Sequence, residues 1–583
     1  MKVSFKDAKI IAEGRYHEKA AYDMASDSAS VVADGCGGLS SYRVNNVAGD
    51  FIRTFLSLDL KAGGEPISPY LPKRVEMVGR TQRVTVFTKE GELSVTTFLS
   101  APVNGVFLRI EAGFPFEFSV NYRGEGARSA RHVSFLKGGR FMLSSSVPGD
   151  WIRENAAFYA SSSGRADLLL SFAAKRTAHR EAFRSFDAHY AATLAEIKGV
   201  EIPTSAETEE EKALYLSAYF TALENYKKVG AFGAFAAGVN YMDPLRTYFR
   251  DSYFTVLPLL RSRPDMVRSE ILTLARGIKK DGSCPSAVKS DFTAFWGDHY
   301  DSPSFFVMEI FEYVKASKDR AVLQERIHGR TLLEIVRSVV ERLIEKSDKR
   351  GLLYKEGKYN KRDWADEVNR NGYVTFVNLL FYCALIGASY LFEEEDAVLS
   401  TRYAFRAAYV KDLINARLFD EEKGYYVNYK TKAFTEDNLS VDTVFAILFG
   451  VAEGERAESL LDRMESLLET KNNAAQGGGD YGVMCVYPPY RVPRGTCHKS
   501  AHPYDYHNGA NWCYLTAMYA YAKLLRGRDW RSPILSTFRY YVTRGQYTPV
   551  EYFSPSCEWG SSLQGWSAAL ALVYQRADRS KKK

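Results

Sequence analysis

The chain has 583 residues with 77 basic and 70 acidic side chains, a formal charge of +7, and 46% apolar residues. This composition excludes a disordered or collagen-like chain. The basic residues are scattered, apart from the run at 581–583, and this excludes the basic stripe of a nucleic-acid-binding protein.

The sequence gives no sign of a membrane or of secretion. No window reaches the roughly 18 consecutive apolar residues that a membrane span needs. The N-terminus lacks the apolar core of a signal peptide. The seven cysteines are odd in number and not closely spaced, which favours reduced thiols. We therefore expect a cytoplasmic protein without a membrane partner.

The first part of the chain, residues 31–176, favours β-strands. Polar and apolar residues alternate on both sides of the turn at Glu90-Gly91, as in a β-hairpin. Many short antiparallel strands must bury one face against a second sheet, so we expect an antiparallel β-sandwich over residues 1–204. A helix at 177–198 lies near its end. The strands are expected at 83–89, 92–99, 114–122 and 167–174.

From residue 205 to residue 583 the apolar period changes to 3.6. The apolar residues between 332 and 344, for example, trace one helix face. The segments share no repeated sequence, so a solenoid is unsupported. A closed double ring of six inner and six outer helices, an all-α (α/α)6 barrel without strands, fits this length. Further amphipathic segments occur at 210–228, 252–261, 303–317, 375–393, 401–416, 440–466, 510–526 and 564–576.

Six of the seven tryptophans lie in three polar-rich regions of the helical half, at 295–303, 361–367 and 504–566. An indole can stack on the C–H face of a pyranose ring, and carboxylates can hold its hydroxyls. The pattern predicts a sugar site. The alternative is that the tryptophans fill the core and the acids are surface charges.

Asp301 directly precedes a Ser-Pro pair, the sequence of a helix start. A helix N-terminus favours the ionised carboxylate, which opposes a role as a proton donor. An acid here would need its pKa raised by burial or by neighbours such as Asp298, Asp363 or Glu367. The alternative is that Asp301 only caps the helix.

Glu551 opens a loop with Pro and Gly ahead of the last helical segment, and the same loop holds Glu558. Inverting glycoside hydrolysis uses two carboxyl groups about 6.5–9.5 Å apart, one to donate a proton and one to activate water. Asp301 and Glu551 can meet this requirement only if the fold brings both residues to the same opening, as a closed ring of helices would. Glu558 is the alternative base.

Other chemistries find little support. Cys497, His498, His502 and His507 lie close together, but their spacing matches no zinc pattern, so we expect no metal. The glycines at 35–38 lie between strands, which argues against a dinucleotide fingerprint. There is no phosphate-binding P-loop and no Gly-x-Ser-x-Gly elbow. We expect no cofactor.

Seven segments, in the same order from about residue 30 to about residue 570, resemble the amylo-α-1,6-glucosidase family, which includes the glucosidase domain of glycogen-debranching enzymes. In this sequence they read Asp34-Gly-Cys-Gly-Gly-Leu-Ser, Phe249-Arg-Asp-Ser-Tyr, Asp281-Gly-Ser-Cys-Pro-Ser, Tyr300-Asp-Ser-Pro-Ser-Phe-Phe, Asp363-Trp with Asn378-Leu-Leu-Phe-Tyr, Tyr506-His-Asn-Gly-Ala-Asn-Trp, and Gln564-Gly-Trp-Ser.

The resemblance implies an N-terminal β-sandwich, an (α/α)6-barrel catalytic domain at 205–583, and hydrolysis with inversion. It assigns the general acid to Asp301 and the general base to Glu551. The residues expected to bind the sugar are Arg250, Asp251, Trp296, Asp363, Trp364, Glu367, His507, Trp512, Gln564 and Trp566.

The sequence also departs from debranching enzymes. A run from Asp366 to Val377 replaces their Val-Thr-Pro-Arg segment, and there is no counterpart of the transferase half. We therefore expect an exo-acting α-glucosidase on oligosaccharides smaller than glycogen. The alternatives are a mannosidase, rhamnosidase or arabinosidase of the same fold, a phosphorylase, or an inactive sugar-binding protein. The sequence predicts no oligomeric state.

Overall fold

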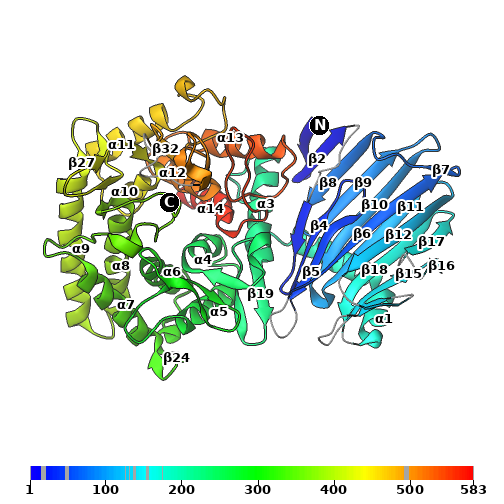
Figure 1. The fold of residues 1–583 in the computed structure, drawn as a ribbon, viewed down its shortest axis with the longest axis horizontal. Helices are drawn as coiled ribbons and strands as arrows, with labels where there is room; N and C mark the ends of the chain where they lie inside the picture. Colours follow the sequence, from blue (N-terminus) through cyan, green and yellow to red (C-terminus); the bar gives the residue numbers. More distant parts are fainter. Residues whose placement is uncertain are drawn as a thin grey trace. The chain divides into compact units, whose positions relative to one another are not determined.

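A computed structural model of the protein describes residues 2–14, 22–45, 51–124, 127–129, 132–134, 140–152, 157–173, 175–490 and 498–581 (Figure 1). The chain divides into two units. The first comprises Met1–Ala231, Met242–Leu245 and Tyr541–Pro549, and the second comprises Phe232–Tyr241, Arg246–Tyr540 and Val550–Lys583. Cys497 of the His-rich segment lies outside the described residues.

Two antiparallel sheets form the first unit. In sheet order, the first has β1 (Lys2–Lys6), β2 (Lys9–Gly14), β8 (Lys73–Val78), β9 (Thr81–Phe87), β10 (Glu92–Ser100), β11 (Gly105–Ala112), β18 (Arg165–Ala173), β15 (Arg140–Ser145), β14 (His132–Ser134) and β13 (Ala127–Ser129). The second has β16 (Gly149–Ile152), β17 (Ala157–Ser162), β12 (Phe116–Gly124), β6 (Phe51–Ala62), β5 (Leu39–Asn45), β4 (Ala29–Ala33) and β3 (Tyr22–Ala25), with β7 (Glu65–Pro66) beside β6.

The predicted hairpin is confirmed, because β9 and β10 pair antiparallel across the turn that contains Gly91. The strands predicted at 114–122 and 167–174 correspond to β12 and β18. The two sheets pack face to face. Tyr42 on β5 meets Phe141 on β15 with ring centroids 5.1 Å apart and the rings edge to face.

The predicted helix at 177–198 is two helices, α1 (Arg176–Arg184) and α2 (Phe186–Lys198). They cover the first sheet through a buried cluster that includes Phe98, Phe107, Leu169 and Phe186. Helix α3 (Glu209–Asn225), which follows the predicted domain boundary at residue 205, is grouped with this unit.

Helices dominate the second unit. Each of α4, α6, α8, α10 and α12 packs against the next, α12 packs against α14, and the turn η9 (Gly565–Ala568) that leads into α14 contacts α4. Figure 1 shows α7, α9 and α11 outside this succession. The helices are α4 (Phe249–Val256), α5 (Pro264–Arg276), α6 (Ser302–Ser317), α7 (Leu332–Lys346), α8 (Thr375–Phe392), α9 (Ala397–Leu418), α10 (Phe445–Leu448), α11 (Gly454–Leu467), α12 (Cys513–Leu525), α13 (Arg531–Val542) and α14 (Ala569–Lys581).

The expectation of a strand-free helical half is wrong. Most of its strands have only two residues, too few for an alternating pattern to register in the sequence. The longest of these strands, β22 and β23, form a three-stranded sheet with β21 ahead of α6. The strands are β19 (Tyr226–Val229), β20 (Phe232–Phe235), β21 (Arg246–Tyr248), β22 (Pro285–Lys289), β23 (Ala294–Asp298), β24 (Arg326–Ile327), β25 (Arg330–Thr331), β26 (Tyr373–Val374), β27 (Phe419–Asp420), β28 (Tyr425–Tyr426), β29 (Tyr429–Lys430), β30 (Thr435–Glu436), β31 (Leu439–Ser440) and β32 (Val486–Tyr487).

One helix has the length and hydropathy of a membrane span, which was not predicted from the sequence. Helix α8 has 18 residues with a mean hydropathy of 1.7, long and apolar enough to cross a bilayer. However, 78% of this segment is buried inside the structure, and α8 packs against both α6 and α9. The helix is therefore placed as a core helix of the second unit.

Candidate active site

The first part of the site joins the starts of α4 and α6. Asp301 directly precedes α6, so the predicted helix start is confirmed, but its side chain makes no capping hydrogen bond. Instead, Oδ2 of Asp301 accepts a hydrogen bond from Nη1 of Arg250 at 2.7 Å. Nδ1 of His299 lies 2.7 Å from Oδ1 of Asp301. The side chain of Asp301 is fully buried between these two partners.

These partners fix the ionisation of Asp301. Burial by itself raises the pKa of this carboxyl, but the charge of Arg250 and the contact with His299 outweigh burial and hold the pKa below its usual value. Burial also lowers the pKa of His299, so the imidazole is neutral at pH 7. A carboxylate can only accept, and His299 therefore donates through Nδ1.

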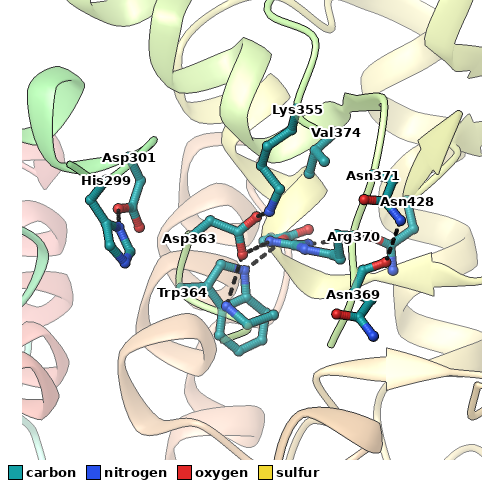
Figure 2. A network of polar contacts seen from close by, with 12 residues as sticks. His299, Asp301, Lys355, Asp363, Trp364, Asn369, Arg370, Asn371, Val374 and Asn428 are labelled. Carbon is teal, nitrogen blue, oxygen red and sulfur yellow. Dashed lines mark hydrogen bonds and ion pairs between the residues drawn. The ribbon is translucent and has the colours of Figure 1, made fainter. Parts of the chain in front are cut away.

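A second buried network surrounds Asp363 (Figure 2). Lys355 donates to Oδ2 of Asp363, and Nη2 of Arg370 donates to Oδ1 at 2.9 Å. Arg370 also donates through Nη1 to Asp442 at 2.7 Å. The indole N–H of Trp364 donates to the same oxygen of Asp442, again at 2.7 Å. The network thus holds the Trp364 ring in one orientation.

The charges of this network keep Asp363 ionised. Burial opposes ionisation, but Arg370 and Lys355 together hold the pKa of Asp363 well below its usual range. Both of its oxygens already accept from protein cations. Asp363 therefore anchors the segment that carries Trp364, and a direct contact with sugar stays a prediction.

Aromatic rings connect the two networks. The Trp364 ring lies 5.0 Å from His507 and 5.5 Å from Trp512, between ring centroids. His507 stacks on Trp512 at 4.8 Å, and Trp512 lies 5.6 Å from Trp566. The guanidinium of Arg250 lies 5.7 Å from the centre of the Trp566 ring. The structure thus brings together predicted residues from four distant parts of the sequence.

Several polar atoms in this group have no hydrogen-bond partner within the described part of the chain. They are Nε of Arg250, Nε2 of His507, Oε1 of Gln564 and Nε1 of Trp566, all of them buried. The backbone N–H of Glu367 donates to Nδ1 of His507 at 3.3 Å, so the ring proton lies on Nε2. Native proteins rarely leave buried polar atoms unsatisfied, and such a cluster is typical of a ligand site.

Glu551 is held by two donors. The Tyr241 hydroxyl donates to Oε1 at 2.9 Å, and the backbone N–H of Ser561 donates to Oε2 at 3.1 Å. Burial raises the pKa of Glu551, and these two hydrogen bonds oppose part of that rise. A Cβ atom at Gly560 would lie only 2.4 Å from Cβ of Glu551, so this position tolerates no side chain without displacement. Glu558, the alternative base, is exposed.

Two further carboxyls near these groups have pKa values close to neutrality. Burial raises the pKa of Asp251 to about 7, although the charge of Arg250 opposes it. Nε2 of Gln564 donates to Oδ1 of Asp251 at 3.1 Å. Burial likewise raises the pKa of Asp366 to about 7, again against Arg250, and Oδ1 of Asp366 lies 3.9 Å from Nδ1 of His507. Both carboxyls are therefore closer to protonation at neutral pH than an ordinary aspartate is.

Strand β23 carries two other residues that the sequence analysis named. Trp296 is 51% exposed and stacks on Phe295 with centroids 5.4 Å apart, so its indole lies at the surface of the protein. Asp298 pairs with Arg342 and Lys346 of α7, which lower its pKa against the effect of burial. Its charge is therefore neutralised locally.

Several residues of the site are not predicted from the sequence. Tyr241 donates to Glu551, and Lys355, Arg370 and Asp442 complete the network around Asp363. His299 stands two positions before Asp301 and could have been found from that proximity. Among the described residues, no group of three or more His, Cys, Asp or Glu side chains could hold a metal ion.

Solved structures with a similar fold are glycoside hydrolases. A bacterial glucoamylase complexed with acarbose is similar with a TM-score of 0.67 and 12% sequence identity over 98% of both chains. A rhamnosidase from Klebsiella oxytoca with rhamnose bound is similar with a TM-score of 0.51 and 15% identity over 95% of both chains. Both of these proteins are (α/α)6-barrel glycoside hydrolases, and at these identities the likeness is one of fold alone.

The sequence itself identifies the family. The model of the family described as amylo-alpha-1,6-glucosidase matches residues 225–572, more than half of the chain. The protein therefore belongs to the amylo-α-1,6-glucosidase family, which confirms the resemblance in the sequence analysis. No curated protein matches the chain in sequence. The family and the fold together support a glycosidase.

Proposed function

We propose that the protein is an inverting, exo-acting α-glucosidase that acts on oligosaccharides in the cytoplasm. The observation that carries this proposal is the cluster of buried, unpartnered polar atoms on Arg250, His507, Gln564 and Trp566 beside stacked indole rings. A sugar ring offers an apolar C–H face for the indoles and hydroxyls for these atoms. A small apolar ligand would leave the polar atoms unsatisfied.

Glu551 acts as the general base in this proposal. Its pKa is raised by burial, which makes the carboxylate a better proton acceptor, and Tyr241 and Ser561 fix both of its oxygens. A base that activates water must be ionised and held in one position. Glu558 is exposed and is therefore the weaker candidate.

Asp301 acts as the general acid, as the family resemblance implies. The ion pair with Arg250 keeps Asp301 ionised, so proton donation requires that sugar binding draw Arg250 away and that Asp301 then take up a proton from solvent. Nε of Arg250 has no hydrogen-bond partner among the described residues and can donate to a sugar hydroxyl. Asp366, whose pKa is about 7, is the alternative donor, because it is already partly protonated near neutrality.

The barrel is part of the same proposal. We assign residues 205–583 to a catalytic (α/α)6 barrel, supported by the succession of contacts from α4 through α6, α8, α10 and α12 to α14 and back to α4 through η9. A closed ring brings the loops that precede α4, α6 and α14 to the same end of the barrel. Asp251, Asp301 and Gln564 belong to those loops or helix starts.

The test is a proton NMR time course with α-1,4- and α-1,6-linked gluco-oligosaccharides. The proposal expects β-glucose first, followed by its mutarotation. Initial release of α-glucose would contradict inversion. A requirement for added phosphate would replace hydrolysis by phosphorolysis, and no release from glucosides, with release from mannosides, rhamnosides or arabinosides, would keep the fold and change the sugar.

A further inference from the structure

Helix α9 buries one face and exposes the other. Its buried side chains pack inward, where α9 contacts α8. On the opposite face Val398, Phe405 and Tyr409 are 82%, 73% and 49% exposed. Such a row of large apolar side chains on a surface helix is typical of an interaction site, whereas single exposed apolar residues are common on any protein.

The exposed residues follow a regular spacing. Positions 398, 402, 405, 409, 412 and 416 are all exposed and are separated alternately by four and three residues. This is the spacing of the seam by which one helix packs against another in a coiled coil. The α9 seam, as we call these six positions, runs over most of a helix of 22 residues, or about 33 Å.

The two charges of the α9 seam carry opposite signs. Arg402 and Asp412 each lie five positions from Ala407, one on either side. Phe405 and Tyr409 each lie two positions from the same residue, and Val398 and Ala416 lie nine positions from it. The seam is therefore self-complementary about its centre.

This symmetry selects one partner and one orientation. Suppose that two copies of α9 cross antiparallel about a two-fold axis that passes at the height of Ala407 along the helix. Arg402 then meets Asp412 of the other copy, and Phe405 meets Tyr409 of the other copy. A parallel arrangement would place Arg402 against Arg402 and Asp412 against Asp412, which is repulsive. We propose that a second copy of this chain docks on the α9 seam and forms an antiparallel two-fold dimer.

The local contacts of the seam leave it able to pair. Nη2 of Arg402 donates to Glu341 at 2.7 Å, but a guanidinium has five N–H donors, and Arg402 is still exposed. Asp412 is exposed as well. None of the candidate active-site residues lies on α9, so the dimer is independent of the proposed function.

Sedimentation velocity over a range of protein concentrations tests the proposal. The wild-type protein is expected to pass reversibly from monomer to dimer, and Phe405→Lys is expected to weaken the dimer at least tenfold with sugar release unchanged. Phe434→Lys is the matched control, because Phe434 is 52% exposed but lies outside α9. A monomer at every concentration, or a dimer that survives Phe405→Lys, overturns the proposal.

A charge exchange tests the antiparallel register. Arg402→Asp and Asp412→Arg should each weaken the dimer, because each places like charges opposite one another, and the double variant should restore it. Glu341→Gln controls for the loss of the ion pair within one copy and should leave the dimer intact. A double variant no better than the single variants would contradict this register. Circular dichroism confirms that every variant is folded.

Discussion

Replacing Tyr241 by Phe tests whether Glu551 is the base, because it removes one hydroxyl and little else. The Tyr241 hydroxyl donates to Oε1 of Glu551 at 2.9 Å, and burial raises the pKa of Tyr241 well above its usual value, so this hydroxyl stays protonated. A phenol that keeps its proton can only donate to a carboxylate. It therefore stabilises Glu551 in the ionised state that a base requires.

The size of the effect follows from the kind of hydrogen bond that is lost. A hydrogen bond to a charged group contributes about 1.5–3 kcal/mol. At 1.36 kcal/mol for each factor of ten, this corresponds to a fall of about 10- to 160-fold in kcat/KM on the acidic limb of the pH profile, where the ionised fraction of Glu551 limits the rate. Since the donor favours the ionised carboxylate, its loss raises the pKa of Glu551, and activity on the acidic side is lost at a higher pH than in the wild type.

The assay is kcat/KM as a function of pH for the wild type, Tyr241→Phe and Tyr248→Phe. Tyr248 is a matched control, because its ring lies 5.7 Å from that of Tyr241 but its hydroxyl bonds to Arg246 instead of Glu551. Tyr248→Phe should leave the acidic limb in place. If both variants shifted that limb equally, or if Tyr241→Phe kept the wild-type profile, the assignment of the base to Glu551 would be wrong.

Three further outcomes are expected. Asp301→Asn and Glu551→Gln should each lower kcat by roughly a thousandfold or more while calorimetry still detects sugar binding, and Glu558→Gln should stay near wild type. Gly560→Ala should lower kcat and also the melting temperature, because the new methyl would lie 2.4 Å from Cβ of the buried Glu551 and must displace it; an unchanged kcat would refute this. Arg370→Met should destabilise the protein by about 3–5 kcal/mol, because it removes the guanidinium that two buried carboxylates share and leaves Asp363 with Lys355 and Asp442 with the Trp364 indole. A denaturant midpoint equal to that of the wild type would contradict the last expectation.

The sequence predicts the elements whose signals are local. The hairpin of β9 and β10 follows from alternation around Gly91, and the start of α6 follows from the Ser-Pro pair after Asp301. The two-residue strands of the second unit have no comparable signal. The split between α1 and α2 also escapes prediction, since Ser185 interrupts the helix without a glycine or proline to mark the break.

Contacts between residues that are distant in the sequence have no such local signal. Tyr241 and Glu551 are 310 positions apart, and Arg370 and Asp442 are 72 positions apart. A tyrosine or an arginine in the sequence gives no indication of which carboxylate it will meet. Family segments predicted Asp363 and Trp364, but not that Lys355 and Arg370 would occupy both oxygens of Asp363.

The ionisation of the site depends on these distant partners and not on local sequence. The position of Asp301 at a helix start correctly indicates an ionised carboxylate, yet the cause in the structure is Arg250 and His299, since the side chain does not cap the helix. Asp251 stands next to Arg250 in the sequence, and burial still raises its pKa to about 7. The charge of Arg250 thus prevails over burial at Asp301 but not at Asp251, so the two carboxyls differ in protonation although the same guanidinium acts on both. The identity of the proton donor therefore has to be read from pH profiles of single variants. If Asp301 donates, Asp366→Asn should keep the basic limb of kcat; if Asp366 donates, that limb should disappear.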